Sequence, residues 1–392
     1  MSKALNIVPD KGAIYEPKPL RIMEILARYK KLDPVNRNHF TNYLRHLQLR
    51  NVAETTVRTK LWKVYGFLIW SEFRDLKAAR PEDLENFYLE RRERKAAATA
   101  FGDIQELKVF FKWLLPGQDL ITFSPQRPRN DLPPEKVLQS DNTRGLLEVC
   151  ENQRDRALVA TFWDSAARLN ELLDCCVGDV KFDRYGAVIS VNGKTGRRNI
   201  RLVSAVPDLQ AWLDRYHPLK GDPAAPLFVV SRRRGTREYT RMNERTVQNL
   251  FKRLRDLSGC SKRTNPHAFR HGRLTTRGKD LTEAELRQYA GWSSRSAMAA
   301  VYVHLSSRDI DDKILKVEGV VQEEEPAPDP MKSRECPRCR RQNAPDAILC
   351  DRCSMALTDE GARYLTIGRE ILEDPDMMIE YARKKKREVK EG

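Results

Sequence analysis

The sequence predicts a multidomain, mainly α-helical protein with a small antiparallel β-sheet. Three observations predict this class. A chain of 392 residues is too long for one ordinary hydrophobic core. Apolar residues recur at helical spacing through its first third, and one short alternating run near the middle is typical of a β-hairpin. Two proline-rich stretches divide the chain, so we expect two domains followed by a C-terminal extension.

Residues 16–116 are expected to form a small all-helical domain. One apolar stripe runs from Val57 to Leu68 at helical spacing, with Thr55 or Thr56 as the expected N-cap. Such a stripe is the face that a helix buries against its neighbours.

Prolines mark the limits of the helices that follow. Pro81 lies where a first helical turn would begin, and a later helix carries apolar residues from Ile104 to Leu114 before Pro116 ends it. Residues 117–136 contain four prolines and little periodicity, so this stretch is expected to be an extended linker.

Residues 137–315 are expected to form a second domain of mixed structure. Helices are predicted around 156–173, followed by two strands, GAVISV at 186–191 and NIRLV at 199–203, which would form a β-hairpin. A later helix has a clear start, because Thr282 and Glu285 have the spacing of a capping box.

The C-terminal extension has three expected parts. Residues 316–332 are acidic and proline-rich, as in a solvated linker. Residues 333–358 contain two cysteine pairs and are predicted to form a zinc ribbon. Residues 359–392 are predicted to form a charged helix.

The chain is strongly basic. It has 71 Lys and Arg against 55 Asp and Glu, a formal charge of +16 and a pI of about 9.5, which favours a nucleic acid partner, although general solubility charge would give the same balance. No apolar run approaches the roughly 20 residues of a membrane helix, and the first residues lack a signal-peptide layout. A cytoplasmic protein associated with the nucleoid is therefore expected.

Three places in the second domain carry side chains suited to phosphate chemistry. They are Arg168 with Glu171, His267 with Arg270, and Tyr302. Each has an ordinary structural explanation when taken alone: a solvated helix pair, a helix-start histidine, and a core tyrosine on an apolar stripe.

Taken in order, these residues resemble the tyrosine recombinase (phage integrase) family over nearly all of residues 16–315. The family has an Arg-x-x-Glu-Leu helix, a Lys in a β-hairpin, a His-x-x-Arg-His helix start, a His or Trp after a Gly, and a Tyr about ten residues later. The matching residues here are Arg168, Lys194, His267, Arg270, Trp292 and Tyr302.

The chemistry of phosphodiester cleavage explains this set of residue types. Guanidinium groups such as those of Arg168 and Arg270 grip phosphate oxygens in two places and remain charged. Tyr302 would be the nucleophile, activated by these arginines and His267. Lys194 is the candidate general acid for the departing 5′ oxygen, although Arg197 and Arg198 share its turn.

The remaining members of the set have smaller expected parts. Trp292 would donate its indole N–H to phosphate, and it cannot shuttle a proton. Glu171 and His271 would support the others. Tyr289 is the nearest alternative nucleophile.

The resemblance implies a helical core-binding (SAM-like) domain at 16–116 and an α/β catalytic domain at 137–315, closing on double-stranded DNA as a C-shaped clamp. It implies site-specific recombination through a 3′-phosphotyrosyl intermediate by a homo-tetramer on two sites, with a monomer when free. Integration or excision of a mobile element is the expected setting. Storing the broken bond on tyrosine needs neither ATP nor a catalytic metal, and the GKT string at Gly193 lacks the earlier glycine of a P-loop.

Two other functions remain open at this point. A type IB topoisomerase-like enzyme would use similar residues to relax DNA without exchanging partners. A catalytically silent descendant would bind DNA as a regulator and form no covalent adduct.

The eight cysteines divide into two groups. Four are scattered, and four form the pairs CPRC and CDRC, ten residues apart, at the spacing that supplies four thiolates to tetrahedral zinc; free or disulfide-paired cysteines are the alternative. Four protein ligands leave no open position, so this zinc is expected to be structural. Basic residues flank the ligands and would contact DNA, a protein or only solvent. The predicted zinc ligands are Cys336, Cys339, Cys350 and Cys353.

Overall fold

A computed structural model describes residues 29, 32–128, 136–193, 196–231, 239–303, 314–315, 317–320, 329–373 and 379. The contacts divide the chain into two compact units. The N-terminal unit spans Lys11–Asp131, and the C-terminal unit contains Leu132–Gly392. None of the helices in the described ranges is long and apolar enough to cross a membrane.

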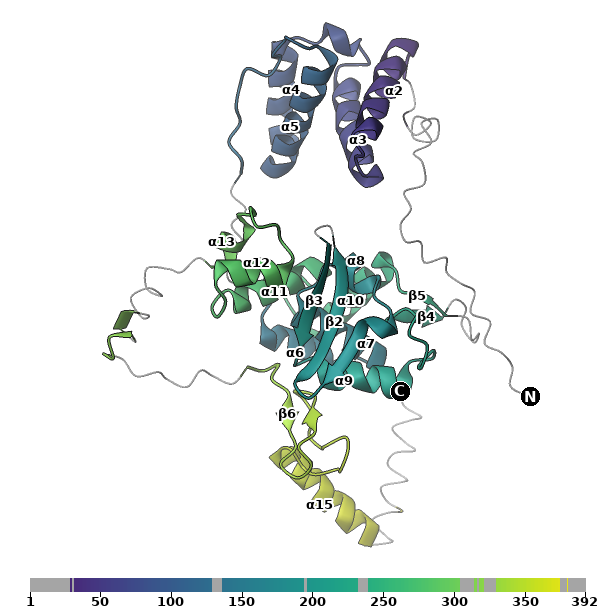
Figure 1. Ribbon diagram of the computed structural model, residues 1–392, viewed down its shortest axis with the longest axis vertical. Coiled ribbons are helices and arrows are strands. Elements are labelled where there is room, and N and C mark those ends of the chain that lie inside the picture. Colours follow the sequence, from purple (N-terminus) through teal and green to yellow (C-terminus); the bar gives the residue numbers. More distant parts are fainter. Residues whose placement is uncertain are drawn as a thin grey trace, which may run out of the picture. The chain divides into compact units, whose positions relative to one another are not determined.

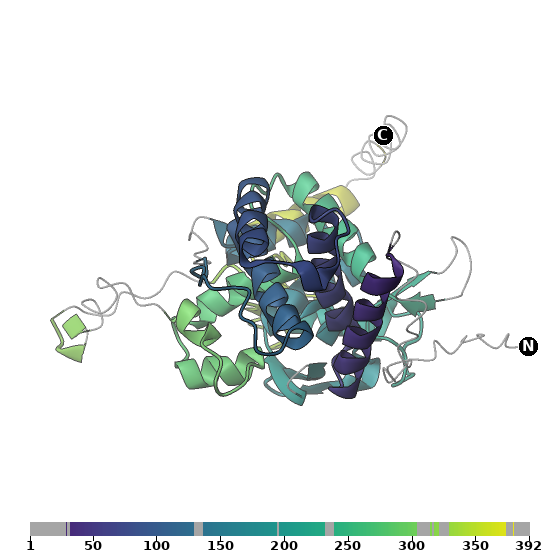
Figure 2. The same cartoon turned by 90° about the horizontal axis from the view of Figure 1, so that it is seen from above.

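Among the described residues, α-helices α2 to α5 build the N-terminal unit (Figures 1 and 2). The helices are α2 (Pro34–Leu49), α3 (Glu54–Trp70), α4 (Pro81–Arg94) and α5 (Ala97–Leu114). Their core is rich in aromatic rings, with Phe40, Phe67 and Phe110 fully or almost fully buried. The apolar stripe from Val57 to Leu68 is buried as predicted.

The limits of these helices agree with the sequence at proline and differ at threonine. Pro81 occupies the first turn of α4 as predicted. The predicted cap of α3 is wrong, because the helix begins at Glu54 after Ala53, without a side-chain cap, and Thr55 and Thr56 lie inside its first turn.

The C-terminal unit is mainly helical and surrounds a three-stranded antiparallel sheet in the order β1-β2-β3 (Figure 1). The strands are β1 (Val180–Asp183), β2 (Gly186–Gly193) and β3 (Gly196–Leu202), so the predicted hairpin is confirmed and gains one strand. Alternate residues of β2 are buried, and Ile189 lies opposite Ile200 in the core. A second, two-stranded sheet pairs β4 (Val229–Ser231) with β5 (Tyr239–Arg241).

The helices of this unit pack on the buried face of the three-stranded sheet, where α7 contacts β3 and α8 contacts β2. They are α6 (Ser140–Glu148), α7 (Gln153–Ser165), α8 (Leu169–Leu173), α9 (Val206–Ala211), α10 (Glu244–Ser258), α11 (Pro266–Arg277), α12 (Glu283–Ala290) and α13 (Met298–Tyr302). The capping box between Thr282 and Glu285 is confirmed at the start of α12. Helices form around 156–173 as predicted, and they are separate, because α7 ends at Ser165 and α8 begins only at Leu169.

The cysteine-rich segment packs against the rest of the C-terminal unit. It contains the short strands β6 (Arg334–Glu335) and β7 (Gln342–Asn343) and is followed by α15 (Asp359–Glu373). Met331 lies at the end of the stretch expected to be a linker, yet its side chain is fully buried within the main core. The segment is thereby joined to the core through packing as well as through the chain.

Candidate active site

The break between α7 and α8 places Arg168. Ala166 ends α7 in the left-handed backbone region at φ 48°, which turns the chain before Arg168 becomes the N-cap of α8. Glu171 then accepts hydrogen bonds from the backbone N–H of Arg168 at 2.9 Å and from its guanidinium Nη1 at 2.6 Å. The Arg-x-x-Glu spacing therefore works as a helix cap rather than as a surface pair.

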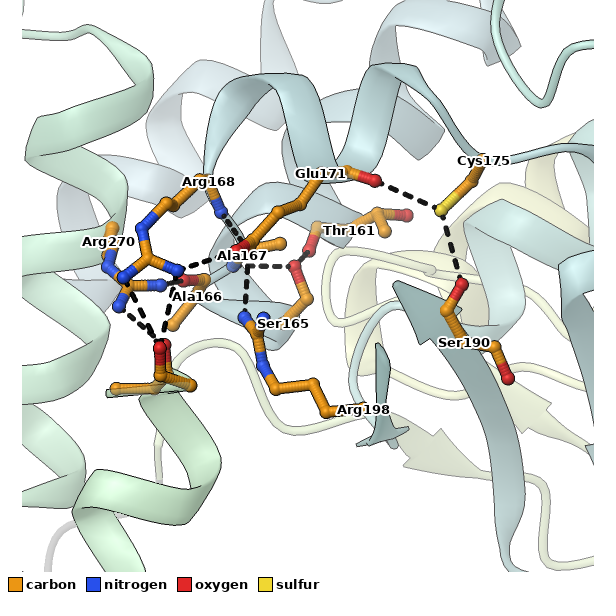
Figure 3. A network of polar contacts seen from close by, with 12 residues as sticks. Thr161, Ser165, Ala166, Ala167, Arg168, Glu171, Cys175, Ser190, Arg198 and Arg270 are labelled. Atoms are coloured by element: carbon orange, nitrogen blue, oxygen red, sulfur yellow. Dashed lines mark hydrogen bonds and ion pairs between the residues drawn. The ribbon is translucent and has the colours of Figure 1, made fainter. Parts of the chain in front are cut away.

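Glu171 also binds a second guanidinium (Figure 3). Arg198 of β3 donates from Nη2 to Glu171 at 2.8 Å, and the Glu171 side chain is almost completely buried. Burial alone would raise the pKa of this carboxyl. Hydrogen bonds from Arg198 and from the backbone and side chain of Arg168 outweigh burial and lower the pKa of Glu171 to about 2.

Arg270, on α11, lies beside Arg168 (Figure 3). Its guanidinium donates to the carbonyl oxygens of Ala166 at 2.7 Å and Ala290 at 2.6 Å, and the residue is 5% exposed. Burial, together with the charge of Arg168, lowers the pKa of Arg270 to about 10, so it still carries its charge at neutral pH. We call Arg168, Arg198, Arg270 and Glu171 the arginine cluster.

The C-terminal end of α12 holds both Arg168 and Arg270. The carbonyl of Ala290 accepts from Arg270, and that of Gly291 lies 3.4 Å from both Nη atoms of Arg168. Carbonyl groups at a helix end have no partner within the helix, so cations are favoured there. Gly291 has φ 63°, and a Cβ on it would lie 2.6 Å from Nη1 of Arg198, so the cluster requires glycine here.

Tyr302 lies in a line of aromatic rings next to Arg270. Its hydroxyl is 2.5 Å from Nδ1 of His271, and Nε2 of His271 is 2.7 Å from Nε2 of His267. Trp292 stacks on Tyr302 with 5.5 Å between ring centroids, and the Arg270 guanidinium lies 5.5 Å from the Trp292 ring. The Trp292 ring thus lies between the Tyr302 phenol and the buried Arg270 guanidinium.

The ionisation of these groups follows from burial. Burial raises the pKa of Tyr302 to about 12, opposed by the charge of Arg270. Burial, with the neighbouring His267 and Arg270, lowers the pKa of His271 to about 4. The pKa of His267 is lowered by burial and by Arg270 and Arg263. At neutral pH the tyrosine is thus a phenol and His271 is an uncharged ring that can accept its hydrogen bond.

Tyr289, the alternative nucleophile, has a hydroxyl that is bonded within the core. Tyr289 donates its hydroxyl to the backbone carbonyl of Asp164 at 2.7 Å, and burial raises its pKa. Asp164 in turn pairs with Arg273 at 2.9 Å in the core. The Tyr289 hydroxyl is thus engaged by a backbone carbonyl of the core.

The structure brings five of the six residues predicted from the family pattern into one region. Lys194 lies outside the described residues. The five are Arg168, His267, Arg270, Trp292 and Tyr302.

Arg198 was left without a definite partner by the sequence. Strand alternation could have predicted that Arg198 points inward. It lies opposite the buried Val191 in the hairpin, and opposite residues share one face of the sheet. Arg197 faces the other way and pairs with the half-exposed Asp179 at 3.1 Å. Nε and Nη1 of Arg198 are buried and have no hydrogen-bond partner in the described part of the chain.

The four paired cysteines form a compact cluster. Their Sγ atoms all lie within 4.8 Å of one another, with Cys336 and Cys353 at 3.6 Å and Cys339 and Cys350 at 3.6 Å. Tetrahedral zinc with Zn–S bonds of about 2.3 Å requires sulfur atoms about 3.8 Å apart. The donor set and its spacing therefore fit this ion.

The two cysteine pairs have the same backbone turn. The residue after each pair, Arg340 or Ser354, has a left-handed conformation, with φ 59° and 57°. Each donates its N–H to the carbonyl of the first cysteine, at 2.9 Å in both cases. Such paired turns aim two thiols from each loop at one point.

An ion network joins the cysteine cluster to α7. Arg156 of α7 donates to Asp208 at 3.1 Å and to Asp346, which lies between the two cysteine pairs, at 2.7 Å. Burial would lower the pKa of Arg156, but the two carboxylates outweigh burial and raise it. This network therefore ties the cysteine-rich segment to α7 through a largely buried guanidinium.

Comparison with known proteins is consistent with this site. Residues 136–308 match the phage integrase family model. The chain is 23% identical over 287 residues to the tyrosine recombinase XerA of Pyrococcus horikoshii, covering 72% of this chain and 94% of that protein. It is 28% identical over 281 residues to XerD of Yersinia pestis, covering 66% and 89%.

Solved structures show the same fold. The integrase of the transposon Tn1549, in complex with transposon right end DNA, is similar with a TM-score of 0.58 at 16% identity, over 72% of this chain and 99% of that one. XerH recombinase bound to its difH substrate gives a TM-score of 0.52 at 17% identity, over 76% and 94%. On its motif residues and these matches, residues 136–308 are similar to the phage integrase family, and the chain shares the fold of the integrase and recombinase structures.

Proposed function

We propose that this chain is a site-specific recombinase that cuts and rejoins double-stranded DNA through a 3′-phosphotyrosyl intermediate on Tyr302. The observation that carries the proposal is the juxtaposition of Tyr302, Trp292 and Arg270, next to Arg168. A phenol beside fixed guanidinium groups has both the nucleophile and the charge that phosphoryl transfer requires.

The two phosphate-directed arginines divide the work. Arg270 is buried and donates hydrogen bonds to two backbone carbonyls, so its charge is fixed in position. The Arg168 side chain is 33% exposed, and its contacts with the Gly291 carbonyl are long at 3.4 Å. A nonbridging phosphate oxygen replaces those long contacts, and the charge built up in the transition state is stabilised without reorganising the site.

Two further residues complete the cycle. Lys194 is proposed to protonate the 5′ oxygen as it leaves, and to take the proton back during rejoining. The indole N–H of Trp292 is proposed to donate to the bound phosphate. Glu171 holds Arg168 and Arg198 in place and stays ionised.

The reaction joins strands from two DNA sites, so the proposed working form is a homo-tetramer. The basic charge of +16 supports a DNA partner. Similar proteins include a transposon integrase bound to transposon DNA and recombinases of the Xer type. Integration or excision of a mobile element is the proposed setting.

The covalent intermediate gives the direct test. A duplex is first selected for binding from a random-sequence library, nicked within the selected site, and incubated with the protein. Wild type should accumulate a covalent adduct, and Tyr302→Phe should bind the duplex equally well and form none.

Tyr289→Phe is the matched control, because it removes a phenolic hydroxyl that bonds to the core carbonyl of Asp164. It should retain the adduct. An adduct on Tyr302→Phe would place the nucleophile elsewhere. Products joined between two sites, rather than relaxed circles from one, would distinguish recombination from a topoisomerase activity.

We further propose that Cys336, Cys339, Cys350 and Cys353 hold one structural zinc ion. Four thiolates saturate the ion, so the zinc orders this segment and takes no part in cleavage. Elemental analysis of the purified protein should give one zinc per chain.

Replacing both Cys336 and Cys339 with Ser should abolish the bound zinc, whereas Cys260→Ser, which lies outside the cluster, should retain it. Adduct formation on a short duplex should persist in the double variant. Zinc that remains bound after the double replacement would contradict this assignment.

A further inference from the structure

Tyr302, His271 and His267 form a continuous chain of hydrogen-bonding atoms. The Tyr302 hydroxyl contacts Nδ1 of His271, and the opposite ring nitrogen of His271 contacts His267, at 2.5 and 2.7 Å. The two histidines are four residues apart on α11, which places both rings on one face of the helix.

The hydrogens of this chain have one consistent direction. Two imidazole nitrogens at 2.7 Å need one donor and one acceptor. If the phenol donates to Nδ1 of His271, the neutral ring carries its own hydrogen on Nε2 and donates it to Nε2 of His267. His267 then holds its hydrogen on Nδ1, so every O–H and N–H points away from Tyr302.

Exposure changes along the same direction. Tyr302 and His271 are half-buried, whereas His267 is exposed. A positive charge on His271 would be poorly solvated and close to Arg270, whereas a charge on the more exposed His267 is better solvated. The charged groups that act on these rings are Arg270 on both histidines and Arg263 on His267.

We propose that His271 is a catalytic residue that takes the phenolic proton of Tyr302 and passes a proton on to His267. This inference rests on the proposed function, in which Tyr302 is the nucleophile. As the bond from Tyr302 Oη to phosphorus forms, the O–H bond breaks and its proton goes to Nδ1 of His271. The Nε2 proton of His271 moves to His267, which becomes an imidazolium ion, while His271 ends neutral.

The remaining atoms balance through the leaving group. The bond between phosphorus and the 5′ oxygen breaks, and that oxygen takes a proton from the general acid proposed above, Lys194. Rejoining runs the same transfers in reverse, so the tyrosine regains its proton when the phosphodiester is restored. The relay therefore serves both halves of the reaction.

Single-turnover cleavage tests the relay, on the nicked selected duplex described above. His271→Asn keeps an acceptor near the position of Nδ1 but cannot pass a proton on. We expect adduct formation to slow by about 10²-fold, within the range of general acid–base effects, with DNA binding unchanged. Its rate should rise with pH between about 6 and 9, as hydroxide takes over deprotonation, more steeply than the wild-type rate.

A second substrate separates nucleophile activation from leaving-group protonation. In a duplex with sulfur in place of the bridging 5′ oxygen, the leaving group needs no proton. The His271→Asn defect should remain on this duplex, because the tyrosine must still lose its proton. A defect repaired by sulfur would place His271 at the leaving group and overturn the relay.

Thr276→Val is the matched control on α11, because it removes a hydroxyl that bonds only to the helix backbone at Gly272 among the described residues. It should cleave like wild type. A His271→Asn rate within twofold of wild type on both duplexes would also overturn the relay. Since adduct formation on Tyr302 would continue in that case, the proposed function would stand.

Discussion

The arginine cluster and helix α13 meet at one site but are held in different ways. Arg270 and Glu171 are buried, and the cluster is joined by ion pairs and by the carbonyls at the end of α12. The five-residue helix α13 buries Ala299 and leaves Val301 half exposed. Its Tyr302 is positioned by a stacked indole and a histidine nitrogen.

This difference shows that the fold itself positions one part of the site more firmly than the other. The charges proposed to bind phosphate belong to the core of the C-terminal unit, so the fold itself holds them in place. The proposed nucleophile is carried by the short helix α13 at the edge of that core. Substitutions in the arginine cluster should therefore change both stability and cleavage, whereas replacing Tyr302 on α13 should change cleavage alone.

Arg270→Lys should have the largest effect. Lysine keeps the charge but cannot donate to the carbonyls of Ala166 and Ala290 together, so the charge is no longer fixed in position. We expect single-turnover cleavage to fall by about 10³-fold, at the upper end of the cost of losing preorganised electrostatic stabilisation of the transition state. Arg277→Lys, at the end of the same helix and more exposed, should cleave like wild type. Similar losses of cleavage in both variants would show that the substitutions disturb helix α11 rather than the guanidinium contacts of Arg270.

Glu171→Gln should reduce the free energy of unfolding by about 3 kcal/mol, because two guanidiniums lose a buried partner. The folded pKa of about 2 lies below the ordinary value of 4.5, so this stabilisation is fully present above pH 4.5 and is lost as the pH falls towards 2. Urea unfolding at several pH values should show wild type and variant converging in acid. Glu148→Gln, which removes an exposed pair with Arg144, is the control. A constant difference across pH would contradict the assignment.

Trp292→Phe should lower cleavage by about tenfold, because the ring can still stack on Tyr302 but has no N–H to give to phosphate. Trp292→His restores a donor and should recover most of the rate. Stability should change little in either variant. If phenylalanine cleaves as well as histidine, Trp292 acts only by packing.

Val301→Ser should have the smallest effect. This side chain is 50% exposed on α13, and such replacements usually change the free energy of unfolding by less than about 0.5 kcal/mol. Thermal unfolding and adduct formation should both match wild type. A loss of adduct with normal stability would reveal a DNA or protein contact on this face of α13.

The sequence predicted the elements whose signals are local. The stripe from Val57 to Leu68, the capping box at Thr282 and the hairpin between 186 and 203 each depend on residues close together in the chain. The site residues were found through their order and spacing, which is a property of the family. Their tyrosine was assigned against its own apolar stripe, and Val301 beside it is indeed exposed.

The features that the sequence did not predict depend on distant contacts. The left-handed Ala166 breaks an otherwise helical pattern, and the carbonyls that it and α12 offer to Arg270 account for the break. The inward placement of Arg198 needs the hairpin register, and its partner Glu171 lies 27 residues earlier. The burial of Met331 follows from a docking contact that has no local signature.

The buried Met331 has a consequence for the order in which the protein folds during synthesis. Folding during synthesis proceeds from the N-terminus, and a ribosome releases Met331 only after the strands and helices of the C-terminal unit have emerged. Until then the core has a gap where its side chain belongs. A gene shortened just before this codon would thus yield every recombination residue and an enzyme with an open core.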